Sequence, residues 1–475
     1  MTLTSAENRH NTFTDVLLMA GILFTFLYRI IEMLWLPNLD AAAQYLPTLW
    51  GLLAGALAVR GQAFRRKTTW VLAAGLALIF LRCFFGGRDT FYWGYRSIVY
   101  GVLAFGVCYQ AAFGLSKKWL LTFLRLLLAF WTLFMAGLSL VGIWAALYDQ
   151  TIMTSAGGVY RIGVTYSRLY LLTFCTNSGS NLALSLLAAL IGMLLTRNPL
   201  GRVLYVLASL VQYAALGLTV ARTAFISVSI ALGSLLACGL MAKLRGNRLS
   251  EKLVRLISFI LAAALAVGSF LLLSKSPELF GDVKEQVRSN TAASTDVVEG
   301  TDTEEGNGTE EAAATSAPRS TNTQSTVQPR PITMDENMLT QRQFAWQAVY
   351  RYIRQHPETL LYGASVVMPM AEVNPLADIE NAAWDHAHNM YIQILLECGI
   401  PGIILLVLFL YSLARAALRL FFSKDKPLWQ RALPVIPICI LISELAECMT
   451  MLVYNLPALA FLMLFSGLVI KFAEE

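Results

Sequence analysis

The sequence predicts an all-α integral membrane protein with about twelve transmembrane helices and a large extracytoplasmic loop that contains short helices. Of its 475 residues, 57% are hydrophobic and only 14% are charged, whereas soluble domains carry about 25% charged residues. The mean hydropathy is +0.59. Apolar runs close to the ~20 residues that cross a bilayer recur along the chain. A chain this long and this apolar is expected to use the bilayer as its solvent.

Twelve apolar runs are expected to form the transmembrane helices. They lie at about 14–36, 45–60, 68–86, 95–113, 119–147, 179–196, 203–220, 223–241, 253–273, 402–421, 433–450 and 454–472. The second run is short, and proline or acidic residues interrupt the last two. Polar residues precede the first run, which is long enough to span, so no cleavable signal peptide is expected.

The distribution of basic residues predicts the orientation in the membrane. With a cytoplasmic N-terminus, the inside segments hold 20 Lys and Arg residues. The short outside loops hold five, namely Arg88, Arg96, Arg161, Arg168 and Arg222. Because cytoplasmic loops carry an excess of Lys and Arg, both termini are expected to be cytoplasmic and the long loop to lie outside. The net charge of +6 follows from this bias, and nothing in the sequence calls for nucleic acid.

The chain divides into three predicted regions. Residues 1–273 form an N-terminal transmembrane bundle of about nine helices, 274–401 form the extracytoplasmic loop, and 402–475 form about three C-terminal transmembrane helices. Within the loop, residues 289–329 are rich in Ser, Thr, Gly and acidic residues and almost free of large apolar ones. Such a segment cannot bury enough surface to offset its chain entropy, so we expect a disordered acidic insert.

Ordered structure is expected to resume near Met338. Residues 341–353 carry an apolar face with helical spacing, which predicts a helix. His356-Pro357 should end this helix, because the residue before a proline is pushed out of the α region. A loop then leads to Trp384.

Two of the four histidines, His386 and His388, stand just before another predicted helix. From Met390 onward apolar residues recur with helical period, which predicts an amphipathic helix along the membrane surface. Gly399 is suited to a left-handed cap at its end. Imidazole is the side chain best matched to proton transfer near neutral pH, so His388 is a candidate base at the height of the lipid headgroups. The alternative is that both histidines cap the helix and bond water.

These residues carry a resemblance to a known family. The pattern His388-Asn389, nine residues, Gly399, two residues, Gly402 resembles the signature of the O-antigen ligase and O-antigen polymerase superfamily of bacterial envelope glycan enzymes. Three further stretches are similar to family segments, at 177–195, 219–224 and 342–363. The resemblance covers about residues 165–421, and the first five helices match only in hydropathy. The insert is longer than the family's usual loop, but it lies between the motifs.

The resemblance implies a metal-independent glycosyltransferase that needs no cofactor and lies in the bacterial cytoplasmic (inner) membrane. Its partners would be membrane lipids, a glycan on undecaprenyl pyrophosphate in the outer leaflet, and an acceptor glycan, lipid or wall polymer. His388 matches the family's histidine and would take the proton from the acceptor hydroxyl, with His386 as a second choice. Arg222 and Arg342 match the arginines that face the pyrophosphate, whose oxygens a planar guanidinium can pair two at a time.

Supporting roles fall to Asn389, Arg161 and Arg168, although each arginine has a simpler interpretation. Arg222 lies between two apolar runs, so it could snorkel to the headgroups. Arg342 could be a solvated residue at the start of a helix. Arg161 and Arg168 could contact solvent or headgroups instead of the donor.

Glu444 and Glu447 lie three residues apart within a predicted span and should share one helical face. Ionisable groups inside a membrane usually face a cavity or a partner. We therefore expect either an interhelical pair or a contribution to the lining of the site.

The leading hypothesis is a transferase in cell-surface polysaccharide biosynthesis, and the sequence does not separate polymerisation from ligation. The alternative is a multi-helix transporter or flippase of glycan precursors, for which twelve helices are common. A transporter is expected to show internal repeats and a central charged pathway, and the sequence has no internal repeat. A non-catalytic scaffold in an envelope-synthesis complex is a third interpretation.

Overall fold

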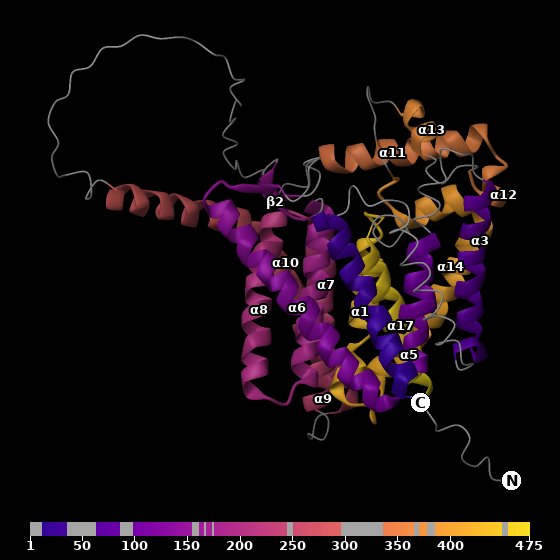
Figure 1. Cartoon of the computed structure of the whole chain (residues 1–475), viewed down its shortest axis with the longest axis horizontal. Helices are drawn as coiled ribbons and strands as arrows, with labels where there is room; N and C mark the ends of the chain where they lie inside the picture. Colours follow the sequence, from indigo (N-terminus) through magenta and orange to yellow (C-terminus); the bar gives the residue numbers. More distant parts are fainter. Residues whose placement is uncertain are drawn as a thin grey trace.

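A computed structural model shows a bundle of membrane-length helices that is capped at one end by shorter elements (Figure 1). It describes residues 12–35, 63–85, 98–153, 161–165, 168–172, 175–244, 250–295, 336–364, 370–377, 384, 386–448 and 455–475. The predicted run at 45–60 lies outside these residues.

Seven helices among the described residues are long and apolar enough to cross a membrane. They are contained in α6 (Lys117–Leu147), α7 (Cys175–Leu195), α8 (Pro199–Thr219), α9 (Arg222–Lys243), α10 (Glu251–Thr295), α14 (Met390–Phe422) and α17 (Leu456–Glu474). Shorter apolar stretches fall in α1 (Thr12–Trp35), α3 (Lys67–Phe85) after the turn η1 (Ala63–Arg65), the π-helix η3 (Val102–Tyr109) with α5 (Gln110–Gly114), and α15 (Leu428–Ala432) with α16 (Val435–Ser443). The chain is a multi-pass helical membrane protein, and the predicted count of twelve spans is not reached within the described part.

The centre of the bundle packs around α17. The Phe461 ring lies 5.0 Å from that of Phe26 in α1 and 5.8 Å from that of Trp131 in α6, centroid to centroid. Farther along α17, a Cβ added at Gly467 would lie 2.8 Å from the Cβ of Ala112 in α5. Glycine here lets the two helices approach closely, and such packing holds membrane helices together because lipid offers no hydrophobic drive between them.

The predicted span at 433–450 is wrong in its length. α16 ends at Ser443 after nine residues, and residues 444–448 continue without helical structure. Glu444 and Glu447 therefore do not share a helical face as predicted. The helix has Pro434 as its N-cap and Pro437 in its first turn, and Glu447 follows it in an irregular segment near the cap.

A small antiparallel sheet interrupts the otherwise helical fold and corrects the all-α prediction in this detail. Strands β1 (Thr151–Met153), β2 (Arg161–Thr165) and β3 (Arg168–Leu171) pair in that order. Ile162 pairs with Leu171 across the β2–β3 register, and both side chains are buried. The strands are only three to five residues long, too short for a distinct alternating pattern in the sequence.

The helix α10 continues through Pro277 to Thr295. Residues 289–295 of the predicted disordered insert are therefore helical, while the boundary predicted at residue 274 between the bundle and the extracytoplasmic loop stays a prediction. The rest of the predicted insert lies outside the described residues. Lys284 forms an ion pair with Asp149 at the end of α6, which ties the extended part of α10 to the bundle.

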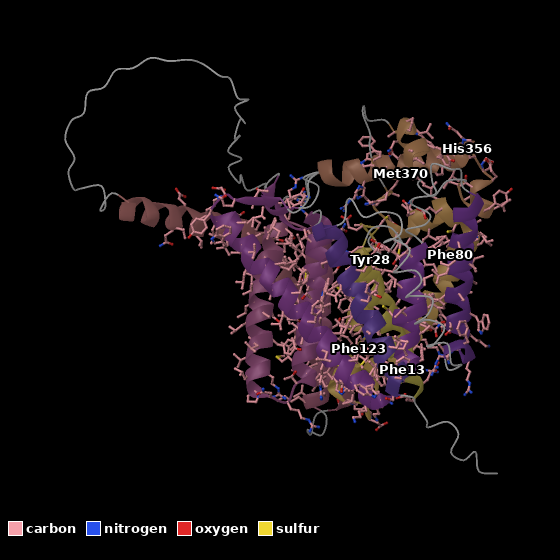
Figure 2. The ribbon with its side chains drawn as sticks, in the orientation of Figure 1. Phe13, Tyr28, Phe80, Phe123, His356 and Met370 are labelled. Carbon is pink, nitrogen blue, oxygen red and sulfur yellow. The ribbon has the colours of Figure 1, made fainter. Side chains whose placement is uncertain are left out.

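The cap lies across one end of the bundle (Figure 1). It consists of α11 (Glu336–Gln355), α12 (Thr359–Tyr362), α13 (Met370–Val373) and the 3-10 turn η4 (Asn374–Leu376). His356 and Met370 lie at this end, whereas Phe13 and Phe123 lie at the opposite end (Figure 2). The helix predicted at 341–353 is confirmed, and it ends one residue before His356 as expected.

Gly399 divides α14 into two helical parts that meet at a kink. Its φ of 63° and ψ of −162° are not helical. The positive φ agrees with the prediction, but this ψ lies outside the left-handed helical region, in a part of conformational space that is essentially restricted to glycine. A Cβ at this position would lie 2.7 Å from the carbonyl oxygen of Leu360 in α12, so the kink also permits close contact with the cap.

Candidate active site

The candidate site lies where three segments meet, namely α11, the residues that precede α14, and the irregular segment after α16. Arg342 comes from the first segment, His386 and His388 from the second, and Glu447 from the third. Side chains that are up to 105 residues apart in the chain thus come into direct contact.

Asn389 holds the second and third segments together. Its Oδ1 accepts hydrogen bonds from the backbone N–H groups of Tyr391 and Ile392, at 2.9 and 3.1 Å. This is an N-cap, which satisfies donors that the first turn of a helix leaves unpaired. Its Nδ2 donates to the carbonyl oxygen of Leu445 at 2.9 Å. Asn389 thus caps α14 and ties it to the segment after α16, and its predicted supporting role at the site stays a prediction.

His388 has an unusual backbone conformation, with a φ of 50°. Histidine is one of the few residues other than glycine that occupy this region more often than average, at a cost of about 1–3 kcal/mol. Its N–H donates to Nδ1 of His386 at 3.1 Å. The neighbouring Met390 N–H donates to the carbonyl oxygen of Glu444 at 3.0 Å. These hydrogen bonds hold the turn that carries the His388 ring in this conformation.

Glu447 lies between Arg342 and His388. The Nη2 atom of Arg342 donates to Oε1 of Glu447 at 2.6 Å. The Nδ1 atom of His388 lies 3.6 Å from the other carboxylate oxygen, Oε2. The Glu447 side chain is only 4% exposed, against 25% for Arg342 and 30% for His388. A buried carboxylate is thus paired with a guanidinium on one side and faces an imidazole on the other.

His386 is the more deeply buried of the two histidines, and its ring contacts that of His388 with centroids 4.3 Å apart. Burial, the largest cause, together with the nearby charges of His388 and Arg342, lowers the pKa of His386 from 6.5 to about 3. It is therefore neutral at physiological pH, and its Nδ1 accepts a bond from the backbone of His388. This makes it a poor acceptor for a substrate proton, which favours His388 for that role.

A polar scaffold fixes the residue between the two histidines. The Ala387 N–H donates to Oε1 of Gln393 at 2.8 Å, and the Ala387 carbonyl oxygen accepts from Nε1 of Trp346 at 2.8 Å. Gln393 in turn donates to Glu397 at 2.6 Å. The turn is thereby held from α11 and α14 at once.

Arg222 is the first residue of α9. Five residues later, Ser227 shares a 2.6 Å hydrogen bond with Ser443, the last residue of α16. Because Glu447 follows Ser443 by four residues, Arg222 and Glu447 lie toward the same end of the bundle. The convergence of Arg222 with His388 on one substrate stays a prediction.

Arg161 and Arg168 open two paired strands of the small sheet. The guanidinium of Arg161 lies over the Tyr170 ring, 5.0 Å from its centroid, a cation–π arrangement. Both arginines lie in the sheet that follows α6. Along the chain, this sheet is far from the loop that carries His388. Their part in donor binding stays a prediction.

Glu447 is the functional candidate whose partners the sequence did not predict. Its position near the end of an apolar run indicated a partner or a cavity lining, but not which partner. An acid within an apolar run needs a cationic partner, and this requirement is the signal that could have identified Glu447.

Glu447, His386 and His388 could also hold a metal ion, since one ligand atom from each lies within 4.8 Å of the others. Histidine nitrogen and carboxylate oxygen are suitable zinc ligands. Arg342 speaks against this use, because its guanidinium already donates to the same carboxylate and would repel a second cation. The metal-independent site predicted from the sequence therefore remains a prediction, and chelation can test it.

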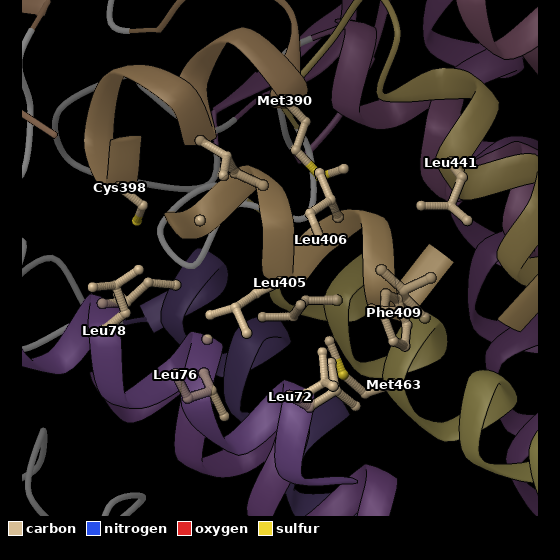
Figure 3. Close-up of a pocket in the computed structure, with 17 residues that line it drawn as sticks. Leu72, Leu76, Leu78, Met390, Cys398, Leu405, Leu406, Phe409, Leu441 and Met463 are labelled. Carbon is tan, nitrogen blue, oxygen red and sulfur yellow. The ribbon is translucent and has the colours of Figure 1, made fainter. Parts of the chain in front are cut away.

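An apolar groove reaches Met390, two residues after His388 (Figure 3). The groove holds about 150 Å³. Its lining is almost entirely apolar and comes from α3, α14, α16 and α17, for example Leu72, Leu76, Leu405, Leu441 and Met463. A cavity of this size and character can take a group about as large as benzene.

Comparison with known families gives one match. Residues 204–407 match a family model described as O-antigen ligase. The matched segment begins in α8 and ends in α14, so it contains Arg222, Arg342 and His388 and stops before Glu447. No curated protein matches the chain.

Proposed function

We propose that this chain transfers a glycan from undecaprenyl pyrophosphate to an acceptor hydroxyl during cell-surface polysaccharide biosynthesis, and the match of residues 204–407 to the O-antigen ligase family model supports this. The observation that supports this most is the meeting of His388, Glu447 and Arg342 at one end of the bundle, beside an apolar groove. The site offers a base for the acceptor hydroxyl, a cation for the pyrophosphate and an adjacent apolar surface for the lipid of the donor.

The reaction is a displacement at the anomeric carbon of the donor sugar. His388 accepts the proton of the acceptor hydroxyl as the hydroxyl oxygen attacks this carbon. The bond between the anomeric carbon and the pyrophosphate oxygen breaks, and undecaprenyl pyrophosphate leaves with the electron pair. Arg342 and Arg222 stabilise the negative charge on the leaving group. Stabilisation of developing charge by preorganised groups is usually the largest single contribution to catalysis.

The apolar groove supports a lipid-linked donor. A polyprenyl chain attached to the pyrophosphate would enter at Met390, which lies beside the candidate base. The groove holds about 150 Å³, which is room for only the first part of the chain. The rest of the chain would extend into the bilayer, where its burial carries no cost.

The proposed location is the bacterial cytoplasmic membrane, with the cap outside the cell. The beginning of α1 and the C-terminus both lie at the end opposite the cap (Figure 1). The excess of Lys and Arg in the loops at that end favours the cytoplasm. The donor glycan would then be met in the outer leaflet, and the acceptor would be a glycan, a lipid or a wall polymer.

The test is glycan transfer by the purified protein with a lipid-linked glycan and an acceptor. His388→Ala should lower turnover by about 100-fold or more, since a general base contributes roughly 10²–10⁴-fold. The matched control is His356→Ala, which removes a half-exposed histidine that contacts Glu358 instead of the site. Flipping of the precursor without glycan transfer would support the transporter alternative and overturn this proposal.

Product analysis in cells separates the two transferase activities. Loss of a polymerase leaves single repeat units on the lipid, whereas loss of a ligase leaves long lipid-linked chains. The reaction at the donor is the same in both cases, so the site described above serves either.

A further inference from the structure

Glu447 has a position that the transfer reaction described above does not yet use. It lies 40 residues beyond the segment that matches the family model, which ends at 407. Its side chain is almost fully buried, and a buried carboxylate is costly unless it is paired and hydrogen-bonded. Its two oxygens face two different groups, Arg342 and His388. This division indicates a role beyond a single ion pair.

We propose that Glu447 is the positioning residue of the transfer site, orienting His388 with one carboxylate oxygen and holding Arg342 for the donor with the other. The inference rests on the proposed function. Among the described residues, the buried Nδ1 atom of His388 has no hydrogen-bond partner, and Oε2 of Glu447 lies 3.6 Å from it. Hydrogen bonds at catalytic residues are often long in the free enzyme and tighten when substrate binds.

The orientation of Glu447 determines which nitrogen of His388 is free to react. With the proton on Nδ1 directed at Oε2, the lone pair of Nε2 is available for the acceptor hydroxyl. After the hydroxyl proton moves to Nε2, the ring carries a positive charge that the Glu447 carboxylate offsets. The proton then leaves to water, and the ring returns to its starting state. A carboxylate behind a catalytic histidine has this same function in hydrolytic triads.

The second oxygen links this arrangement to donor binding. In the free protein the guanidinium of Arg342 is paired with Glu447, which holds the place that a pyrophosphate oxygen would take. Arrival of the donor puts two anions in competition for one cation. Glu447 therefore weakens the binding of the donor while it favours the chemical step.

Removal of the Glu447 charge should change kcat and donor affinity in opposite directions. Glu447→Gln should lower kcat by about 100-fold, the lower range for loss of base function. The same variant should bind the donor as tightly as the wild type or more tightly, because Arg342 no longer has a competing carboxylate. A purely structural role would weaken binding and turnover together.

The experiment measures donor binding and single-turnover rates with an undecaprenyl-pyrophosphate-linked glycan, using full-length protein in nanodiscs. Glu447→Asp is the second variant: it keeps the charge but withdraws the carboxylate, so kcat should fall while donor binding stays unchanged. Glu444→Gln is the matched control, since Glu444 is also buried and contacts Met390 through its backbone carbonyl. It should leave kcat within about threefold of the wild type, a far smaller change than the roughly 10²-fold or greater loss expected when a general base is impaired.

The results separate this inference from the proposed function. If the wild-type protein transfers no glycan, the proposed function fails. If the wild type is active and Glu447→Gln keeps its kcat, or loses donor affinity in parallel with kcat, only the role of Glu447 is overturned. Equal losses in Glu444→Gln and Glu447→Gln would likewise overturn it, because they would point to folding of the segment after α16.

Discussion

The guanidinium of Arg342 lies 2.6 Å from the carboxylate of Glu447, and this contact joins the cap to the C-terminal part of the bundle. Because Glu447 also faces His388, one ion pair connects the candidate base to the candidate binding group for pyrophosphate.

Removal of Arg342 should affect both stability and donor binding. Arg342→Ala leaves the buried Glu447 carboxylate without its strongest donor, which should cost about 1–3 kcal/mol in the free energy of unfolding. The double variant Arg342→Ala with Glu447→Gln should recover much of that stability, because no unpaired charge remains. It should not recover transfer activity. A denaturant titration in mixed micelles measures the first effect, and a donor KM measures the second.

The histidine pair should give a stability that depends on pH. His386 has a pKa of about 3 in the folded protein against 6.5 in the unfolded chain, so the folded state binds fewer protons between these values. The contribution of His386 to the free energy of unfolding is therefore complete above pH 6.5 and is lost as the pH falls toward 3. The thermal midpoint should fall over this window, and His386→Gln should flatten the fall. An NMR titration in which the His386 ring gains its proton near pH 6.5 would contradict this assignment.

Gly399 should not tolerate a side chain. Gly399→Ala places a Cβ 2.7 Å from the Leu360 carbonyl oxygen and forces alanine into a region of φ and ψ that only glycine occupies readily. We expect a loss of several kcal/mol in stability, since this strain alone costs about 1–3 kcal/mol, together with a loss of activity. The control is Gly268→Ala in α10, where a Cβ meets nothing within 4 Å. This change should be neutral or slightly stabilising.

The apolar groove beside the site can be filled without disturbing the bundle. Gly75 lines the groove, and a Cβ at this position meets nothing within 4 Å. Gly75→Phe should raise the KM for the polyprenyl donor while kcat at saturating donor is largely kept. Gly137→Phe in α6 is the control, because it also has open space around it and does not line the groove. An unchanged KM in a folded Gly75→Phe variant would exclude the groove as the lipid site.

Chelation tests whether the site works without a metal. Transfer activity should be unchanged after EDTA treatment, because Arg342 supplies the positive charge beside Glu447. Loss of activity on chelation, with recovery on addition of Zn²⁺, would instead assign His386, His388 and Glu447 as metal ligands. Metal analysis of the purified protein provides an independent measurement.

Local patterns in the sequence were sufficient for the segments that carry the site. The helix over 341–353, its end before His356-Pro357, and the glycine bend at 399 all depend on residues within a few positions of each other. The match over 204–407 then supports the family that His388-Asn389 and the two following glycines had indicated.

Features that depend on tertiary contacts were not accessible in the same way. The pairing of Glu447 with Arg342 spans 105 residues, and no periodicity links them. The sheet was missed because its strands are very short. The extended part of α10 includes Lys284, whose partner Asp149 is distant in the sequence. The predicted span at 433–450 failed because hydropathy does not reveal where a helix ends inside a bundle.

The Asn389 amide fixes the position of His388 relative to Glu447. Its oxygen caps α14 and its nitrogen binds the backbone at Leu445, so the segments that carry His388 and Glu447 are held together. Arg342 belongs to a separate helix of the cap. A change of partner by the Arg342 side chain, from Glu447 to the donor, would therefore leave His388 and Glu447 aligned with each other.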